Sequence, residues 1–302
     1  IDIARLRLWL SLVVDEDDLD PIETLPNLDY KIVCGNSLIG LPTQGADRYP
    51  QLKDELEILK KDFFKETNEK EKKSLRNLIT KKIDDVFKTA LDFDGYRIDF
   101  DFKLFFSEVW REKGGFDVVI GNPPYISTKG VSEEDKKLLK KQYNFADDTY
   151  NHFYFKGIDL LKENGVLTYI TPKTFWTTQT KRNLRDLLLK NRINYIFDTA
   201  NPFDAAMVDT CVIAVVKQTT KDNTVLFIDG TKDLSNPLKY EVKQEVYLNT
   251  QNSIIFKPTE ENMKIFNLYG HKVKELYNQW WEKISTSKNI EKSKSELETY
   301  RK

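Results

Sequence analysis

The stretch Phe116-Asp117-Val118-Val119-Ile120-Gly121-Asn122-Pro123-Pro124-Tyr125 contains the strongest fold signal in the sequence. Phe116 to Gly121 is a nearly continuous apolar run ending in glycine, which is typical of a strand buried on both faces of a parallel sheet. The next four residues stand at the carboxyl end of this predicted strand, where open α/β sheets bind their ligands. The sequence therefore predicts an α/β fold with a ligand site at residues 122–125.

Other apolar runs alternate with helical patterns after this stretch. Strands are predicted at residues 165–170, 193–197 and 210–216, and helices at 152–162 and 181–190. This alternation predicts a doubly wound, mostly parallel sheet. Upstream, Tyr30 to Cys34 is expected to form a short strand closed by Gly35-Asn36-Ser37.

A helical insertion is expected at about residues 43–112. Its apolar residues recur at helical spacing between 51 and 90, and lysine and glutamate crowd the other faces. We interpret it as two helices with a solvated outer face, and an arm that touches DNA is the alternative. A catalytic domain is predicted over residues 1–252, with the insertion inside it. Residues 253–302 should form a helical linker.

The composition excludes several classes of protein. The 302 residues contain 47 Lys and Arg against 48 Asp and Glu, for a net charge of -1, so a globally basic nucleic-acid binder is excluded. No apolar run approaches the roughly 20 residues of a membrane span, so no membrane partner is expected. Two cysteines and two histidines predict neither a disulfide framework nor a metal site, and the cytoplasm is the expected compartment.

The residues Asn122-Pro123-Pro124-Tyr125 suit chemistry on an aromatic amine. The lone pair of such an amine is delocalised into its ring, and two acceptors that hold both N–H bonds draw the nitrogen towards a tetrahedral shape. The side-chain oxygen of Asn122 and the carbonyl of Pro123 would be these acceptors, so catalysis would rest on positioning and electrostatics. Pro124 keeps residue 123 extended, and Tyr125 offers a flat face to an extruded base. The alternative is a proline-stiffened turn.

Residues 115–125 resemble motif IV of the S-adenosylmethionine-dependent amino-methyltransferases. The closer resemblance is to the gamma-class adenine-N6 DNA methyltransferases of restriction–modification and phage-defence systems, above all the fused type IIG enzymes. It extends over about residues 1–217, and more weakly over 253–270. The supporting stretches are Ile3 to Leu10, Ile32 to Leu38, Phe102 to Trp110, Gly165 to Pro172, and Phe203 to Ala206 with Asp209 to Cys211.

The resemblance implies roles for individual residues. Asn122 and Pro123 would grip the target amine, and Tyr125 would stack on a flipped adenine. Asn36 matches a position that reads the adenine of S-adenosyl-L-methionine, with a turn residue as the alternative. Phe203 matches an aromatic that packs against the target base, with a core residue as the alternative.

Three basic residues follow the Thr171-Pro172 strand end. Lys173, Lys181 and Arg182 are candidates for contact with a DNA phosphate. A solvated helix face is the alternative for these side chains. The implied partner is double-stranded DNA, inside a prokaryotic cell.

Two parts of the resembled family are absent from the sequence. Its glycine-containing cofactor loop has no counterpart, because no Gly-x-Gly occurs in the chain, and no ribose-binding acidic residue is assigned. We expect the missing strand to lie upstream of Ile1, so that the chain is a fragment with little activity alone. The strand at 118–120 would then lack a neighbour. The resembled family carries a target-recognition domain after its catalytic domain, so the linker at 253–302 would lead towards one. Sequence specificity, and any fused or associated nuclease, would then lie elsewhere in the protein.

Two other functions remain open. The same four-residue motif occurs in enzymes that methylate a glutamine amide of release factors or guanine in ribosomal RNA, although these are compact and lack such an insertion. A non-catalytic DNA-binding module of a defence system is the second alternative. That module would have no reason to keep Asn122 and Tyr125 together.

Overall fold

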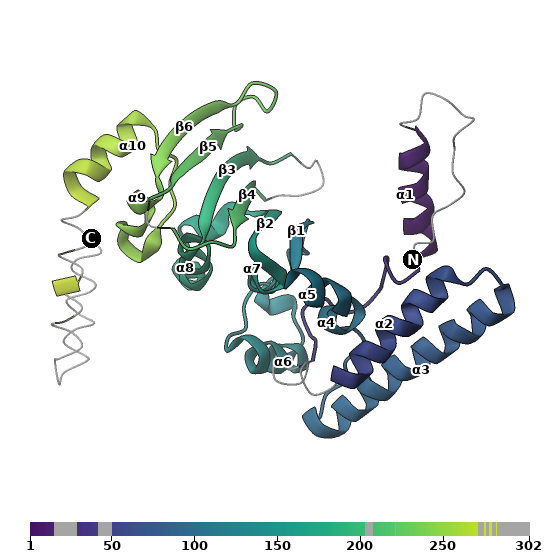
Figure 1. The fold of residues 1–302 in the computed structure, drawn as a ribbon. Coiled ribbons are helices and arrows are strands. Elements are labelled where there is room, and N and C mark those ends of the chain that lie inside the picture. The colour runs from purple at the N-terminus through teal and green to yellow at the C-terminus, as the bar shows by residue number, and fades with distance from the viewer. Residues whose placement is uncertain are drawn as a thin grey trace. The chain divides into compact units, whose positions relative to one another are not determined.

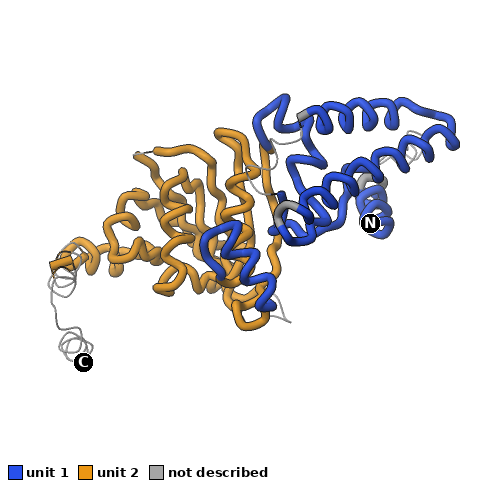
Figure 2. Tube along the Cα trace, turned by 90° about the horizontal axis from the view of Figure 1, so that it is seen from below, with its two compact units in different colours: residues 1–115, 132–146 blue, residues 116–131, 147–302 orange. Residues whose placement is uncertain are grey.

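The computed structural model describes residues 1–14, 29–41, 50–202, 208–220 and 222–270, together with 275, 278, 279 and 282. The chain forms two compact units (Figure 2). The first contains residues 1–115 and 132–146, and the second contains residues 116–131 and 147–302. The second unit therefore begins at the first residue of the strand that precedes Asn122.

The first unit is helical in the part that the structure describes. Its helices are α1 (Asp2–Val14), α2 (Pro50–Lys65), α3 (Glu69–Asp94), α4 (Phe102–Phe105), α5 (Ser107–Lys113) and α6 (Glu133–Tyr143). Asn68 caps α3, because its side-chain oxygen accepts from two backbone N–H groups of the first turn. Gly95 ends α3 with a φ of 74°, a left-handed conformation that favours glycine.

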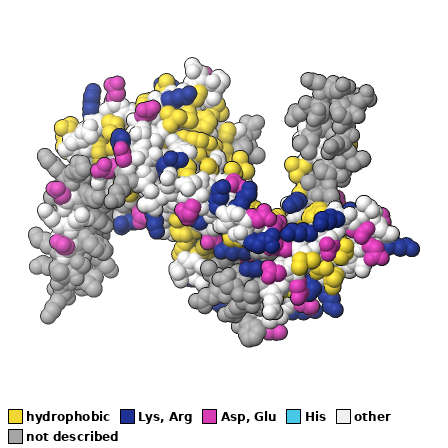
Figure 3. Space-filling view, viewed as in Figure 1, with side chains coloured by type: hydrophobic (Ala, Val, Ile, Leu, Met, Phe, Trp, Pro, Cys, Tyr) yellow, Lys and Arg dark blue, Asp and Glu magenta, His cyan; other side chains and the backbone are white. Residues whose placement is uncertain are grey.

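Helices α2 and α3 lie side by side and form the predicted insertion (Figure 1). The apolar residues at helical spacing face inward, and the buried ones are Leu56, Phe63, Ile79, Ile83, Val86 and Ala90. Figure 3 shows basic and acidic side chains interspersed along the outer faces of these helices. Mixed charge of this kind agrees with a solvated surface.

The strand predicted from Tyr30 to Cys34 is not formed. Residues 29–41 follow turns and bends, and Tyr30 has a left-handed φ of 61°. The ring of Tyr30 packs edge-on against Phe63 of α2, with ring centroids 5.3 Å apart. The segment is thus attached to a helix through its side chains, and no strand occurs in the described part of the first unit.

The second unit is built on a six-stranded sheet. Its strands are β1 (Phe116–Gly121), β2 (Leu161–Pro172), β3 (Arg192–Ala200), β4 (Thr210–Val216), β5 (Thr224–Asp229) and β6 (Leu238–Lys243). They are ordered β1-β2-β4-β3-β5-β6. Helices α7 (Thr149–Leu160), α8 (Arg182–Lys190), α9 (Gln244–Leu248) and α10 (Glu260–Ile265) accompany the sheet (Figure 1).

The predicted α/β class is confirmed, but the sheet is mixed and not mostly parallel. Among the described strands, β1 with β2 and β3 with β5 pair in parallel, and the other three pairings are antiparallel. β3 ends at Ala200 and β4 begins at Thr210. A parallel return needs a crossover of a dozen or more residues, so the short connection brings β4 back antiparallel.

The strand before Asn122 is not buried on both faces. β1 is at the edge of the described sheet, where it pairs only with β2. The side chains of Val118 and Ile120 are 59% and 78% exposed. The expected neighbour on the other side is not among the described strands, so the apolar run that predicted a central strand belongs to an edge strand here. The linker predicted at 253–302 falls mostly outside the described residues.

Candidate active site

The residues Asn122 to Tyr125 follow the last residue of β1, as the sequence predicts. Asn122 is exposed, Pro123 is buried and Tyr125 is half-buried. The Tyr125 hydroxyl lies 2.8 Å from Asn122 Oδ1 and 3.0 Å from the carbonyl oxygen of Ile170, at the end of β2. Its single proton is shared between these two acceptors.

This hydroxyl orients the carboxamide of Asn122. Burial raises the pKa of Tyr125, and nearby Cys211 adds to the effect, so the phenol stays protonated at neutral pH. The donated proton selects the carboxamide orientation in which Oδ1 faces Tyr125. A carboxamide oxygen has a second lone pair, which remains able to accept a hydrogen bond from an amine.

Lys173 contacts acidic side chains on either side of the segment that carries Phe203. Its ammonium forms ion pairs with Asp198 at the end of β3 and with Asp209 before β4, each at 3.0 Å. Burial lowers the pKa of Lys173, but these carboxylates outweigh it and the net shift is upward. A phosphate would have to compete with both carboxylates. Phe203 itself lies outside the described residues.

Lys181 and Arg182 are neighbours in sequence with different surroundings. Lys181 is 5% exposed and forms ion pairs with Asp147 and, at 2.7 Å, with Asp148. Arg182 is exposed, with its Nε 3.4 Å from Asp186. Of the two side chains, only that of Arg182 is exposed, and a phosphate contact by Lys181 stays a prediction that would require its ion pairs to break.

Asn36 lies in the first unit and caps a turn. Its side-chain oxygen accepts hydrogen bonds from the backbone N–H groups of Leu38 and Ile39, at 3.0 and 3.2 Å. Both lone pairs of that oxygen are therefore used, as in the alternative interpretation of this residue.

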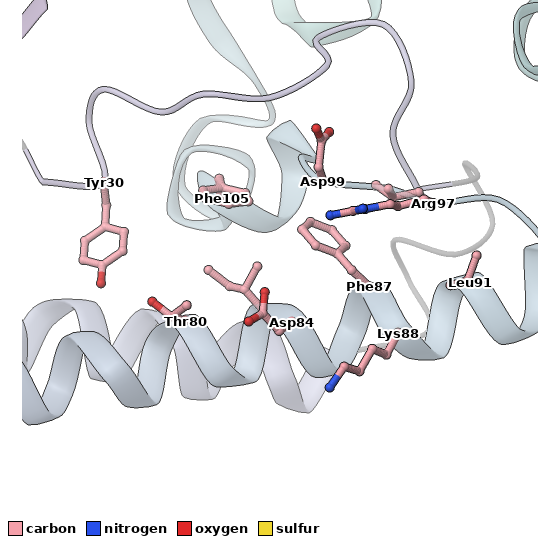
Figure 4. Close-up of a pocket in the computed structure, with 11 residues that line it drawn as sticks. Tyr30, Thr80, Asp84, Phe87, Lys88, Leu91, Arg97, Asp99 and Phe105 are labelled. Atoms are coloured by element: carbon pink, nitrogen blue, oxygen red, sulfur yellow. The ribbon is translucent and has the colours of Figure 1, made fainter. Parts of the chain in front are cut away.

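A pocket of about 610 Å³ lies along α3 in the first unit (Figure 4). Its lining includes Asp84 and Lys88 of α3, and Arg97 and Asp99 of the following segment. Asp99 Oδ1 also accepts a hydrogen bond of 3.2 Å from the backbone N–H of Asn36. The lining contains both acidic and basic side chains and so carries no strong charge of one sign.

The structure reveals residues near the motif that the sequence patterns did not single out. Thr149, the first residue of α7, donates a hydrogen bond of 2.5 Å from Oγ1 to the Pro124 carbonyl. Asp147 and Asp148 precede it and hold Lys181. The run Asp147-Asp148-Thr149 before an apolar helix is a helix-start signal, and it could have marked this segment.

His152 gives this region a predicted pH dependence. Burial lowers the pKa of His152 from 6.5 to about 4, with partial compensation by Asp147, and Lys181 and Asp148 also face it. The neutral ring accepts a hydrogen bond of 3.0 Å at Nε2 from the Asp147 N–H. On acidification, His152 of the unfolded state binds a proton at a higher pH than His152 of the folded state. The contribution of the neutral ring to the free energy of unfolding is therefore complete above pH 6.5 and is lost between pH 6.5 and about 4.

We expect the second unit to lose about 2 kcal/mol of stability between about pH 7.5 and about pH 5 through this group. Hydrogen exchange of the α7 amides in the purified protein measures the loss, after correction for the pH dependence of intrinsic exchange. The variant His152→Asn should lack this component. Equal pH dependence of the variant and the wild-type protein would exclude His152 as its source.

Neither a metal site nor a membrane helix emerges from the described residues. No group of three or more metal-ligating side chains comes together within them. None of the helices in that part of the chain is long and apolar enough to span a bilayer.

Comparison with known proteins places these features in a family. The family described as Eco57I restriction-modification methylase matches residues 1–204. A candidate type II restriction enzyme and methyltransferase of Methanocaldococcus jannaschii is 24% identical over 330 residues, covering 82% of this chain and 27% of that protein. The type II methyltransferase M.HincII of Haemophilus influenzae is 30% identical over 164 residues, covering 51% and 32%.

Solved structures also align with parts of the chain. One such structure belongs to a type I restriction–modification (R-M) system and was determined in a study of complex assembly. It has a TM-score of 0.36 and 15% sequence identity, and the alignment covers 62% of this chain and 46% of that chain. The chain spans less than a third of the length of the two relatives named above.

Proposed function

The chain belongs to the Eco57I restriction-modification methylase family, and from this premise we propose that it is the catalytic part of a DNA adenine-N6 methyltransferase. The enzyme would use S-adenosyl-L-methionine, act on double-stranded DNA in the prokaryotic cytoplasm, and serve a restriction–modification or phage-defence system. Target-recognition and nuclease functions would come from other parts of the protein or from associated chains.

One observation carries this proposal. The exposed Asn122 carboxamide stands at the carboxyl end of β1, and the Tyr125 hydroxyl holds its oxygen at 2.8 Å. A hydrogen-bond acceptor with a fixed orientation, next to an aromatic ring, is what a primary aromatic amine needs for binding. The relative named as an adenine-specific methyltransferase, BrxX of Escherichia coli, supports adenine as the base; it is 29% identical over 89 residues.

The bound cofactor would supply an electrophilic methyl group. Asn122 and the Pro123 carbonyl would accept the two N–H bonds of the amine and stabilise the positive charge that develops on nitrogen. The base must leave the duplex to reach them, at a cost of a few kcal/mol, and stacking on Tyr125 would offset part of that cost. As the N–C bond would form, the S–C bond would break and the sulfur would leave as a neutral thioether. The methylated amine would then release one proton to water, and this mechanism needs neither a metal nor a covalent enzyme intermediate.

Methyl transfer from labelled S-adenosyl-L-methionine by the full-length protein tests the proposal. We expect label in duplex DNA as N6-methyladenine, and none in release factor or ribosomal RNA. Label on a glutamine amide or on guanine would favour the alternative substrates, and DNA binding without any transfer would favour a non-catalytic module. The 302-residue chain, assayed in parallel, should show neither tight cofactor binding nor turnover; micromolar cofactor binding by this chain would contradict the proposed need for further residues.

A further inference from the structure

The loop after Tyr125 is attached to the start of α7 by three hydrogen bonds. Thr149 Oγ1 donates to the Pro124 carbonyl at 2.5 Å and accepts from the Ile126 N–H at 3.1 Å. The Thr149 N–H donates to the Ile126 carbonyl at 2.9 Å. The hydroxyl of one buried threonine therefore holds backbone groups on both sides of Tyr125.

Asp148 attaches the same loop at a second point, Thr128. Its Oδ1 accepts from both the backbone N–H and the hydroxyl of Thr128, at 2.8 and 3.1 Å. Its Oδ2 forms the ion pair with the buried Lys181. Burial raises the pKa of Asp148, but the contacts with Lys181 and Thr128 outweigh it and the net shift is downward, so the carboxylate is ionised at neutral pH.

Lys181 in turn is buried, so water cannot replace the carboxylates that it contacts. It is 5% exposed, and its ammonium lies between Asp147 and Asp148 and 5.4 Å from the centre of the Tyr150 ring. Moving a buried charge away from its carboxylates is strongly unfavourable, so the ion pairs hold residues 147–149 in one place. Because Thr149 follows Asp148 directly in the chain, these ion pairs also fix the position of Thr149.

On the opposite side, the motif is held by the sheet. Tyr125 donates to the Ile170 carbonyl of β2, and the backbone of β1 pairs with β2 up to Gly121. Residues 122–124 therefore lie between two anchored points, β2 and Thr149. A shift at the Thr149 end would move the Pro123 carbonyl and the Asn122 side chain relative to each other.

We propose that Thr149, held by Lys181 through Asp148, is a positioning residue that sets the geometry of the two amine acceptors. This role rests on the proposed methyltransferase function and adds to it residues that would act without touching the base or the cofactor. A positioning residue of this kind affects the rate of the chemical step, because a displacement of about 1 Å can cost about 100-fold in rate. It leaves DNA affinity unchanged.

The matched pair Thr149→Val and Thr149→Ser in the full-length protein tests the role. Valine keeps the shape and removes the hydroxyl, so we expect a fall in kcat of about 10- to 100-fold. Serine keeps the hydroxyl and should stay within about 3-fold of wild type. The Kd for duplex DNA should change less than about 2-fold in both variants, since neither alters a phosphate contact. An equal loss of kcat in both variants, or a parallel loss of DNA binding, would overturn the role.

A second pair of variants separates positioning from phosphate contact. Lys181→Gln should lower kcat and leave the salt dependence of DNA binding unchanged, whereas loss of a phosphate contact would reduce the slope of log K against log salt by about 0.9. Lys190→Gln, an exposed lysine at the end of α8, is the control and should leave kcat unchanged. Because Lys181 would act through Thr149, the double variant with Thr149→Val should lose less activity than the product of the single losses.

The outcomes distinguish this role from the function on which it rests. A wild-type protein that transfers no methyl group would overturn the proposed function and this role with it. Wild-type transfer with an unchanged kcat in Thr149→Val would overturn the positioning role alone. A reduced slope of log K for DNA against log salt in Lys181→Gln would show that Lys181 contacts a DNA phosphate. That result would contradict its proposed action through Thr149.

Discussion

Replacing Asn122 with alanine in the full-length protein should lower kcat for methyl transfer by about 100- to 1000-fold. The variant loses the side-chain acceptor whose oxygen Tyr125 orients at 2.8 Å, so the amine keeps only one of its two proposed partners. DNA binding should persist, because the carboxamide is proposed to contact the target base and not a phosphate. Steady-state transfer of labelled methyl groups gives kcat, and fluorescence anisotropy of a labelled duplex gives Kd.

Two control variants accompany this prediction: one keeps an acceptor oxygen at position 122, and the other removes a carboxamide elsewhere on the surface. Asn122→Asp keeps an acceptor oxygen and should retain more activity than alanine. Asn236→Ala removes a comparable carboxamide from an exposed loop between β5 and β6 and should behave as wild type. An Asn122→Ala enzyme with normal kcat would show that this side chain does not hold the reacting amine.

Replacing Arg185 with methionine should destabilise the second unit by about 3–5 kcal/mol, at about 1–3 kcal/mol for each buried carbonyl left without a donor. The guanidinium is fully buried and donates to three backbone carbonyls. Nη1 reaches Phe175 and Thr178 at 2.6 and 2.7 Å, and Nε and Nη2 both reach Asn252, at 3.0 and 2.9 Å. Methionine would leave all three carbonyls without this donor in a region closed to water.

Arg182→Met is the matched control, since it removes an exposed guanidinium from the same helix. Its ion pair with Asp186 is solvent-exposed, so the loss should be below about 1 kcal/mol. Hydrogen exchange of the α8 amides is the suitable measurement, because it reports the second unit separately in a chain with two units. Similar exchange in the two variants would show that the Arg185 contacts add nothing to stability.

Local patterns predicted the strands of the second unit well. The four apolar runs predicted as strands correspond to β1, β2, β3 and β4. The strands β5 and β6 were missed, although Val225 and Phe227 alternate with less buried neighbours in the manner of a strand. The order of strands along the sheet depends on the length of connections and on packing between distant segments, and periodicity carries no information on either.

The site was predicted in part for a similar reason. The position of Asn122 to Tyr125 after a strand follows from local sequence, whereas the bond between Tyr125 and Asn122 depends on the backbone of the loop. Lys181 was expected at the surface because an isolated lysine usually is. Its partners Asp147 and Asp148 lie 34 and 33 residues away, and only the fold brings these charges together.

The open edge of β1 matters for anyone who handles the chain by itself. Among the described strands β1 is the edge strand of the sheet, and it carries the largely exposed Val118 and Ile120. An edge strand with exposed apolar side chains is a template for strand addition between molecules. We therefore expect the chain to aggregate during expression and concentration, and Ile120→Lys is the simplest remedy for crystallisation trials.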